Sequence, residues 1–241
     1  MLSLILGLMS VQAAADPMAE AVRSRLPLGS ELLFETGPEN LTATGPEDAL
    51  ETSRRDDDTA PSRRVLQTKV TRKGANQYEV QVLSKASLLP VRKGQAVLMA
   101  FDIRCPEGGR ESGEGAWYAT IQRSVSPWDA IAFTDGPAGR NWRRFYVSGI
   151  ADKDFDKGVL QVAIHVAHQP QTLEFGGFAC FALPQGTDRS KLPFTKVTYP
   201  GMEANAKWRT KAAQMIEKNR KAPFTIKVTR QGRPVSGASV L

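Results

Sequence analysis

The sequence predicts an all-β protein, an antiparallel β-sandwich or jelly roll, followed by one α-helix and the start of a small β unit. Apolar and polar residues alternate in several short runs between residues 78 and 166, as on strands that have one buried face. Gly, Pro and Asp residues that favour turns separate these runs. No helical pattern lies between them, so we expect strands joined by turns, which is typical of an antiparallel sandwich.

Composition and charge restrict the class of protein. The chain has 241 residues, of which 41% are hydrophobic and 24% charged, as expected for a globular protein with one main domain. It is long enough to bury a core without disulfides or metals. The net charge is +7, but no run of five or six basic residues occurs. We therefore expect no nucleic-acid partner.

The N-terminus predicts a signal peptide over residues 1–15. Leu2 to Met9 form an apolar run, and Ala13 to Ala15 supply small residues for cleavage before Asp16. No Lys or Arg precedes Arg23, so a start codon further upstream or a lipid-facing anchor are alternatives. The apolar run is too short to span a bilayer, and nothing later in the chain is long enough either. We expect a secreted or periplasmic protein with no membrane partner once the signal is removed.

Residues 16–64 are expected to form an N-terminal strand region with a long polar loop. Residues 16–30 hold a short amphipathic stretch that ends at Gly29. Residues 36–64 are rich in Thr, Pro, Gly, Glu and Asp, with a dense charge cluster at 54–58. Such a composition buries little apolar area, which predicts a long loop or a partly disordered insertion. We expect part of this region to join the sandwich.

The sandwich itself is expected over residues 65–201. Alternating runs predict strands around 78–82, 97–104, 117–122 and 160–166. Turns are predicted at 92–94, 106–109, 135–137 and 156–158. Gly176 and Gly177 are expected to let the backbone bend or approach a neighbour closely.

Two smaller elements follow the sandwich. Over residues 202–222 we predict one connector helix, because apolar residues recur at three- and four-residue steps until Pro223: Ala204, Trp208, Ala212, Met215 and Ile216. Over residues 223–241, alternation from Phe224 predicts a strand, a turn at 231–234 and a return strand from Val235. An isolated hairpin is marginal in water, so we expect the opening of a further unit.

The C-terminal segments carry a resemblance to a known family. Ile216 to Lys221, the strand from Phe224, and Gly232 to Ala238 resemble the connector before the catalytic barrel in family 10 glycoside hydrolases, the xylanase family. Upstream, further segments resemble the accessory sandwich in front of that connector: Val91 to Gly94, Gln171 to Gly177, Tyr199 to Gly201, and Trp208 with Arg209. That sandwich is similar to jelly-roll carbohydrate-binding modules of the galactose-binding-like fold. The resemblance covers roughly residues 65–241.

The resemblance implies a non-catalytic accessory module. The family's chemistry uses two glutamates on a (β/α)₈ barrel of about 200 residues or more. Nothing of that barrel precedes Leu241, so no catalytic residue is carried over. Either the chain is a fragment with the catalytic domain in cis, or a frameshift truncated the gene, or the barrel lies on another polypeptide in trans. Glu174 and Asp102 are expected to be lone carboxylates. We expect no cofactor and no metal site, although a structural calcium, present in many similar modules, stays open.

A sugar site needs aromatic faces for the C–H patches of the rings, and amides or imidazoles for the hydroxyl groups. Trp128 follows Pro127 in a predicted loop and is the strongest candidate for an exposed platform. His165 lies on the polar face of its strand, where it would line a concave sheet; the alternative is a solvated strand face. The candidate sugar-binding residues are Trp128, Trp117, His165, Gln161 and Gln122.

Alternatives remain open for several of these residues. Trp117 begins an alternating strand, which favours a place in the core, and Trp142 is expected to be a core residue as in the resembling modules. His165 and His168 are three residues apart, on opposite faces of a strand, so we expect no shared metal. Cys105 and Cys180 are either buried small hydrophobes or one disulfide of an exported protein.

Two hypotheses for function follow. The first is a carbohydrate-binding module that targets xylan or glucan for a secreted xylanase-like enzyme. The second is a structural or interaction sandwich that packs on a catalytic barrel and binds no sugar. A third, an enzyme complete in itself, would require carboxylates that the fold brings together as a pair.

Overall fold

A computed structural model describes residues 16–109, 111–196, 202–223 and 225–239. The predicted signal peptide, residues 1–15, lies outside the described residues. The chain divides into two compact units, Met1–Thr195 and Lys196–Leu241. Among the helices of the described ranges, none is long and apolar enough to cross a membrane.

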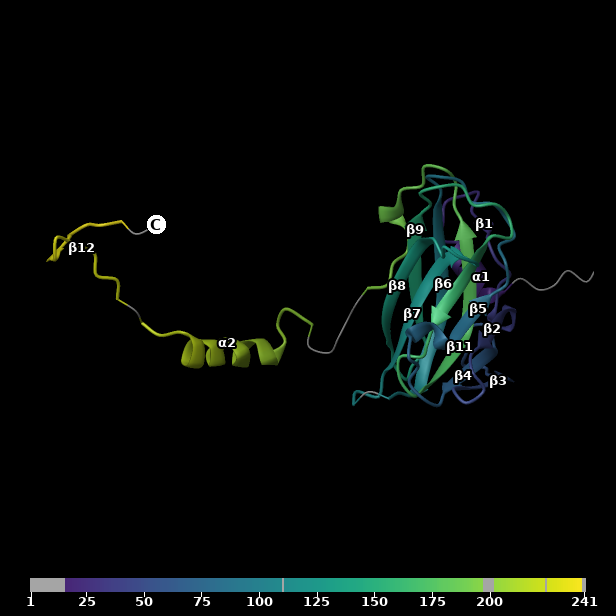
Figure 1. The fold of residues 1–241 in the computed structure, drawn as a ribbon, viewed down its shortest axis with the longest axis horizontal. Coiled ribbons are helices and arrows are strands. Elements are labelled where there is room, and N and C mark those ends of the chain that lie inside the picture. The colour runs from purple at the N-terminus through teal and green to yellow at the C-terminus, as the bar shows by residue number, and fades with distance from the viewer. Residues whose placement is uncertain (1–15, 110, 197–201, 224, 240–241) are drawn as a thin grey trace, which may run out of the picture. The chain divides into compact units, whose positions relative to one another are not determined.

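The first unit is a sandwich of two antiparallel sheets, which confirms the predicted fold class (Figure 1). In the six-stranded sheet the order is β3-β4-β11-β6-β9, with β1 also paired to β11. In the five-stranded sheet the order is β2-β5-β10-β7-β8. The strands are β1 Glu31–Leu32, β2 Leu41–Thr44, β3 Leu50–Asp56, β4 Arg64–Val70, β5 Gln81–Ser84, β6 Ala96–Glu107, β7 Gly115–Arg123, β8 Ala130–Ala138, β9 Arg143–Ile150, β10 Leu160–His165 and β11 Gln171–Ala182.

The core lies between the inner faces of the two sheets. Along β10 the inward side chains of Leu160, Val162 and Ile164 are fully buried, as their alternation predicts. Trp117 of β7 packs edge-on against two rings of the opposite sheet, with centroid distances of 5.0 Å to Phe101 and 4.7 Å to Phe145. Such aromatic contacts join the sheets and contribute beyond their buried area.

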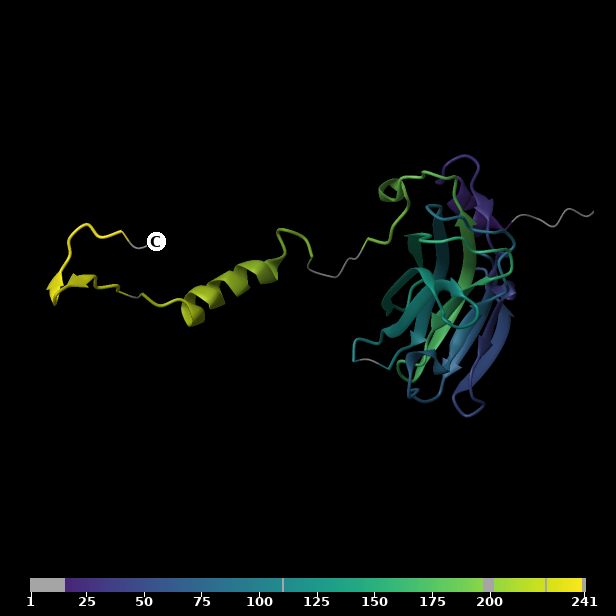
Figure 2. The ribbon, with the colours of Figure 1, turned by 45° about the horizontal axis from the view of Figure 1, so that its top comes forward.

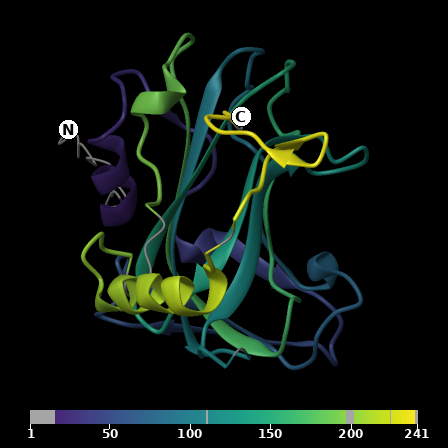
Figure 3. The ribbon, with the colours of Figure 1, turned by 90° about the vertical axis from the view of Figure 1, so that its left-hand side faces the viewer.

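One short helix covers part of the outer face of the six-stranded sheet. Helix α1 (Pro17–Arg23) begins at Asp16, whose Oδ1 accepts hydrogen bonds from the backbone N–H groups of Met18 (2.8 Å) and Ala19 (3.0 Å). Met18, Ala19 and Val22 are buried and pack against outward residues of β6 and β11. Figures 2 and 3 show α1, in purple, beside this sheet. The amphipathic stretch predicted at 16–30 is therefore an α-helix with one buried face.

The prediction of a long loop at 36–64 is wrong in part, because β2 and β3 lie there. Strand β3 pairs with β4 from Leu50↔Val70 to Asp56↔Arg64, yet all its residues after Leu50 are exposed. Backbone pairing at a sheet edge holds this strand. An edge strand without a buried face shows no alternation in sequence, which is why the pattern did not reveal it.

The predicted turn at 135–137 is also wrong, since these residues belong to β8. This strand is the edge of the five-stranded sheet, where a proline is tolerated because its missing N–H breaks no central ladder. Gly136 lets the Trp117 ring approach, since a Cβ there would lie 2.8 Å from the indole. The turns at Gly94 and Gly158 are confirmed, both with positive φ (80° and 84°).

The second unit holds helix α2 (Lys207–Arg220), which confirms that a helix lies within 202–222, while its role as a connector stays a prediction. A two-residue strand, β12 (Thr229–Arg230), pairs with β13 (Arg233–Pro234) across a turn at Gln231-Gly232. The hairpin is shorter than predicted: residues 225–228 form no strand, and the return strand precedes Val235. Phe224 lies outside the described residues.

Candidate functional site

The outer face of the five-stranded sheet gathers polar and aromatic side chains. His165 of β10 lies directly opposite Gln81 of β5 and Tyr118 of β7. Four residues earlier on β10, Gln161 lies opposite Gln122 of β7. Residues opposite each other on neighbouring antiparallel strands share a face of the sheet. These five side chains therefore belong to one surface, which points away from the core.

A row of rings crosses this face from strand to strand. The Tyr118 ring stacks on His165 (centroids 5.3 Å apart, planes at 24°) and on Phe133 (6.1 Å, 21°). Tyr78 meets His165 edge-on at 6.0 Å. Neighbouring rings cover one another, so His165 is only 8% exposed, whereas Tyr78 (54%) and Phe133 (66%) at the ends remain open. The end rings are the ones that can receive a flat ligand.

Trp128 completes a hollow beside this row. The loop between β7 and β8 carries its side chain, which is 55% exposed. Together with Tyr78, Gln81, Gln122 and His165 it lines a cavity of about 400 Å³. Three of the five candidate residues from the sequence, Trp128, His165 and Gln122, thus meet in one cavity.

Ion pairs fix the base of the Trp128 loop. The Asp129 carboxylate Oδ2 lies 2.6 Å from Lys153 Nζ and 3.8 Å from Arg123 Nε. The backbone N–H of Arg123 donates to the Asp129 carbonyl (2.9 Å), and that of Trp128 donates to Val125 (3.1 Å). Trp128 has φ 61°, a left-handed conformation that non-glycine residues adopt only where surrounding structure enforces it. The loop therefore holds Trp128 in place before any ligand arrives.

Two buried polar atoms on this face lack a partner. Within the part of the chain that the structure describes, His165 Nδ1 and Thr120 Oγ1 make no hydrogen bond. Buried polar atoms left unpaired are costly and rare, and they mark places where a ligand or a water completes the site. Burial, and secondarily the nearby His168, lower the pKa of His165 to about 4. The imidazole is therefore neutral at neutral pH, with one nitrogen to donate and one to accept.

Two sequence candidates do not line the cavity. Trp117 is 1% exposed in the core, so its role as a sugar contact is ruled out and the alternative, a core residue, holds. The Trp117 side chain lies on the inward face of β7, while Tyr118 and Gln122 point outward. Gln161 lies on the outer face, but its Nε2 donates to the Ser84 carbonyl (2.9 Å).

Tyr78, Gln81 and Tyr118 are not among the candidate residues predicted from the sequence. Tyr118 and Gln81 occupy the polar phase of alternating runs, and that signal was present in the sequence. Alternation of Tyr78, Val80 and Val82 with Glu79 and Gln81 predicts a strand with Tyr78 on its apolar face. The structure instead places it in a 3₁₀ turn, Gln77–Glu79, which precedes β5 and leaves its ring exposed.

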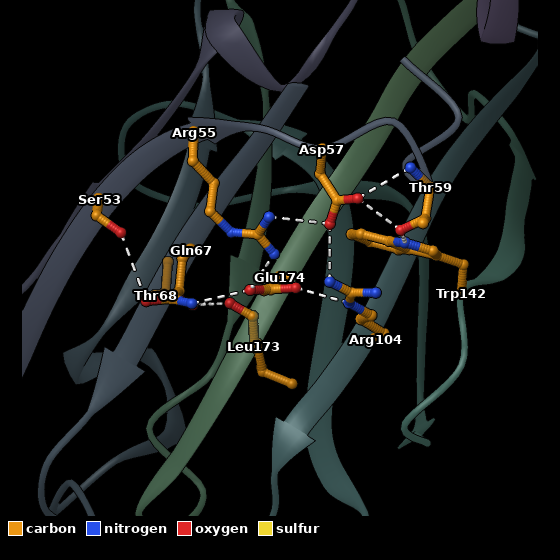
Figure 4. Close-up of polar contacts among 10 residues, drawn as sticks. All are labelled: Ser53, Arg55, Asp57, Thr59, Gln67, Thr68, Arg104, Trp142, Leu173 and Glu174. Atoms are coloured by element: carbon orange, nitrogen blue, oxygen red, sulfur yellow. Dashed lines mark hydrogen bonds and ion pairs between the residues drawn. The ribbon is translucent and has the colours of Figure 1, made fainter. Parts of the chain in front are cut away.

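The outer face of the six-stranded sheet carries a different cluster, a charge network centred on Glu174 of β11 (Figure 4). Glu174 Oε1 accepts hydrogen bonds from Arg55 Nη2 (2.9 Å) and Gln67 Nε2 (2.8 Å), and Oε2 accepts from Arg104 Nε (2.6 Å). Asp57 Oδ2 joins the same two arginines at 3.0 and 2.9 Å. The side chain of Glu174 is 2% exposed, so this carboxylate is buried and fully paired.

This network is not an acid/base pair, although it brings two carboxylates to the same arginines. Hydrogen bonds from Thr59, then from Arg55, lower the pKa of Asp57 to about 2. Burial raises the pKa of Glu174, but hydrogen bonds from both arginines and Gln67 outweigh it and lower the pKa overall. A general acid must hold its proton near neutral pH, and neither group does. The expectation of a lone Glu174 is corrected, and the pairing is structural.

Asp102 and Trp142 lie on the same outer face of the six-stranded sheet as the charge network. Asp102 accepts a bidentate pair of hydrogen bonds from Arg144 (2.9 and 2.8 Å), so it too is not a lone carboxylate. Trp142 is not a core residue: the Arg104 guanidinium lies 4.4 Å above its ring centroid. A Cβ on Gly176 would lie 2.7 Å from that ring, which confirms the close approach predicted for this glycine.

Neither cysteine forms a disulfide. Cys105 and Cys180 are both buried with free thiols, and burial raises the pKa of Cys105 to about 11 and that of Cys180 still higher. The interpretation as buried small hydrophobes is therefore confirmed. Within the described ranges, no group of three or more His, Cys, Asp or Glu side chains is placed to hold a metal ion.

No protein-family model and no curated protein matches the sequence. Several solved structures resemble the chain. A CBM4 structure is 11% identical and has a TM-score of 0.46, over 59% of this chain and 86% of that one. The CBM22-1 xylan-binding domain of Paenibacillus barcinonensis Xyn10C is 11% identical, with a TM-score of 0.43 over 64% and 92%.

The N-terminal cellulose-binding domain of Cellulomonas fimi β-1,4-glucanase C is 16% identical, with a TM-score of 0.44, over 66% of this chain and 99% of that one. Identities and TM-scores this low do not assign a ligand. The chemistry of the outer face has to do so.

Proposed function

We propose that the outer face of the five-stranded sheet binds a carbohydrate without catalysis. The observation that carries this is the cavity of about 400 Å³ lined by Tyr78, Trp128, Gln81, Gln122 and His165. Two half-exposed rings offer surfaces for the C–H patches of sugar rings, and two amides and an imidazole offer partners for hydroxyl groups. With His165 neutral, every lining side chain is uncharged, which suits a neutral sugar.

The finer proposal concerns the polymer and the parent enzyme. The ligand is a plant-type polysaccharide, xylan or glucan, and the module serves an exported xylanase-like glycoside hydrolase whose catalytic domain lies in cis or in trans. The sequence resemblance at 216–221 and 232–238 supports this assignment. A binding module raises the effective concentration of its enzyme at the polymer, so even weak binding at each site is useful.

The competing function is an interaction sandwich that binds no sugar. Val125, Trp128 and Phe133 are all more than half exposed and lie on or beside β8. Neighbouring exposed apolar side chains are typical of a protein interface, which favours packing against a catalytic domain. The two functions differ in what Trp128 contacts.

Affinity gel electrophoresis with xylan, β-glucan and mannan tests the proposal. We expect at least one polymer to retard the protein, and Trp128→Ala to weaken retardation at least tenfold, about 1.4 kcal/mol. Trp142→Ala is the matched control, because this tryptophan packs on the outer face of the other sheet and its loss should leave retardation unchanged. Circular dichroism establishes that both variants fold. Absence of retardation by all three polymers would overturn the proposal and favour the interaction sandwich.

A further inference from the structure

The net charge of the protein is concentrated in its second unit. Residues 196–241 contain ten Lys and Arg against two Asp and Glu, a net charge of +8, while the whole chain carries +7. Residues 1–195 therefore carry −1. A cationic segment joined to a nearly neutral sandwich attracts anionic partners, and the sandwich does not share that attraction.

Helix α2 carries an apolar arc that its own unit leaves uncovered. Trp208, Ala212, Met215 and Ile216 are spaced i, i+4, i+7 and i+8, which places them within about 100° of the helix circumference. None of the fourteen residues of α2, all of them described by the structure, is buried. Trp208 and Met215 are each 49% exposed and Ile216 is 44% exposed. Figure 1 shows the helix in yellow-green.

Cations flank this arc on both sides. At 100° per residue, Lys211 and Lys218 border one edge and Arg220 borders the other. The acidic residue of the helix, Glu217, lies on the opposite side, where it pairs with Lys221. A polyanion without apolar surface, such as a nucleic acid or an acidic polysaccharide, would pair with the cations but would leave the apolar side chains of the arc without a contact. Cations along both edges of an apolar arc match an interface where acyl chains lie below a layer of phosphates.

We propose that α2 binds the surface of an anionic lipid bilayer, with its apolar arc at the acyl boundary and its lysines among the phosphates. The expectation of no membrane partner rested on the lack of a run long enough to span a bilayer, and a helix that lies on the surface needs no such run. Each Lys or Arg near an anionic surface raises partitioning roughly fivefold, so binding is strong at low salt and weakens as salt rises. This activity is independent of sugar binding by the sandwich.

Vesicle sedimentation with the full chain tests the proposal. We expect the protein to sediment with vesicles that contain phosphatidylglycerol but not with pure phosphatidylcholine, and to dissociate as salt is raised. Tryptophan fluorescence should shift to shorter wavelength on binding, and this shift should be absent in Trp208→Phe. Met215→Ser combined with Ile216→Ser should weaken binding at least tenfold.

A matched pair of charge variants separates the arc from general attraction. The first double variant, Lys211→Gln with Lys218→Gln, removes two positive charges beside the arc. The second, Thr210→Glu with Gln214→Glu, adds two negative charges on the far side of the helix. Each therefore lowers the net charge by two. We expect about 25-fold weaker binding for the first double variant and a much smaller loss for the second. Equal losses, with the Met215/Ile216 variant binding like the wild type, would show a general polyanion site and overturn the proposal. So would an absence of binding to anionic vesicles at low salt; retention on sugar polymers is measured separately and bears only on the sandwich.

Discussion

The two outer faces of the sandwich use polar side chains in opposite ways. On the six-stranded sheet, α1 covers one part, and in the other part Glu174, Asp57 and Asp102 are paired with arginines. On the five-stranded sheet, buried atoms of His165 and Thr120 have no hydrogen-bond partner among the described residues, and the rings of Tyr78 and Phe133 are exposed. A face whose polar groups satisfy one another stabilises the fold, whereas a face that leaves them unsatisfied is suited to a ligand.

The largest effect on stability is expected from the charge network on the outer face of the six-stranded sheet. Glu174→Ala removes the buried carboxylate that accepts hydrogen bonds from Arg55 and Arg104, which keep Asp57 as their partner, and we expect a loss of about 2 kcal/mol of the free energy of unfolding. Glu51→Ala on the same sheet is the control, because its pair with Lys69 is exposed and contributes little. Urea denaturation measures both. If the two variants lose the same stability, the network does not stabilise this face.

The next effect is the pH dependence of stability that His165, on the outer face of the five-stranded sheet, should cause. The pKa of His165 is about 4 in the folded protein and 6.5 in the unfolded chain, so the unfolded chain binds more protons between these values. Stability is therefore complete above pH 6.5 and falls by roughly 1–2 kcal/mol as the pH is lowered to 5. His165→Asn should flatten this dependence, and His168→Asn should not. The paired carboxylates titrate at lower pH and do not obscure this window.

A third variant pair locates the boundary of the binding site. Tyr78 lines the cavity, whereas Phe133 is the more exposed ring but stacks on Tyr118 outside the lining. Tyr78→Ala should weaken polysaccharide binding about tenfold, and Phe133→Ala about twofold or less. Isothermal titration with a soluble polymer distinguishes them. A larger loss at Phe133 would move the site toward β8.

The smallest expected effect tests the loop that presents Trp128. Asp129→Lys breaks the contacts with Lys153 and Arg123 and should weaken binding two- to fivefold, since partly exposed ion pairs contribute up to about 1 kcal/mol. Asp129→Lys combined with Lys153→Asp restores one pair and should recover much of the affinity. Lack of recovery would mean that this ion pair does not position Trp128.

Alternation made the sandwich predictable, and three of the five residues that line the cavity were among the predicted candidates. The polar phase of the strand at 160–166 pointed to His165, and a tryptophan after a proline in a loop pointed to Trp128. Strand pairing cannot be derived from alternation, so Gln81 and Tyr118 were not joined to His165, although both lie opposite it. Alternation gives the face on which each side chain lies, but the neighbouring strand and the register are properties of the folded sheet.

Other elements escaped for different reasons. Strand β3 has no buried face, so no alternation marks it in the sequence. Trp142 lies on the outer surface and not in the core: its ring packs against Gly176, which has no side chain, and Arg104 covers it. The charge network joins β3, β4, β6 and β11 with the loop after β3, and no local spacing predicts such a meeting. The buried and exposed faces of single strands could therefore be predicted from the sequence, whereas strand pairing and side-chain contacts between strands could not.

The proline in β8 has a consequence for how the protein behaves at high concentration. An exposed edge strand offers a row of hydrogen-bonding groups to which a second chain can add, the first step of amyloid-like growth. Pro137 removes one donor from the edge of the five-stranded sheet, and charged side chains occupy the edge formed by β3. If the protein binds a polymer as proposed, it would meet copies of itself often on that surface, and the edges formed by β3 and β8 would then oppose pairing between copies.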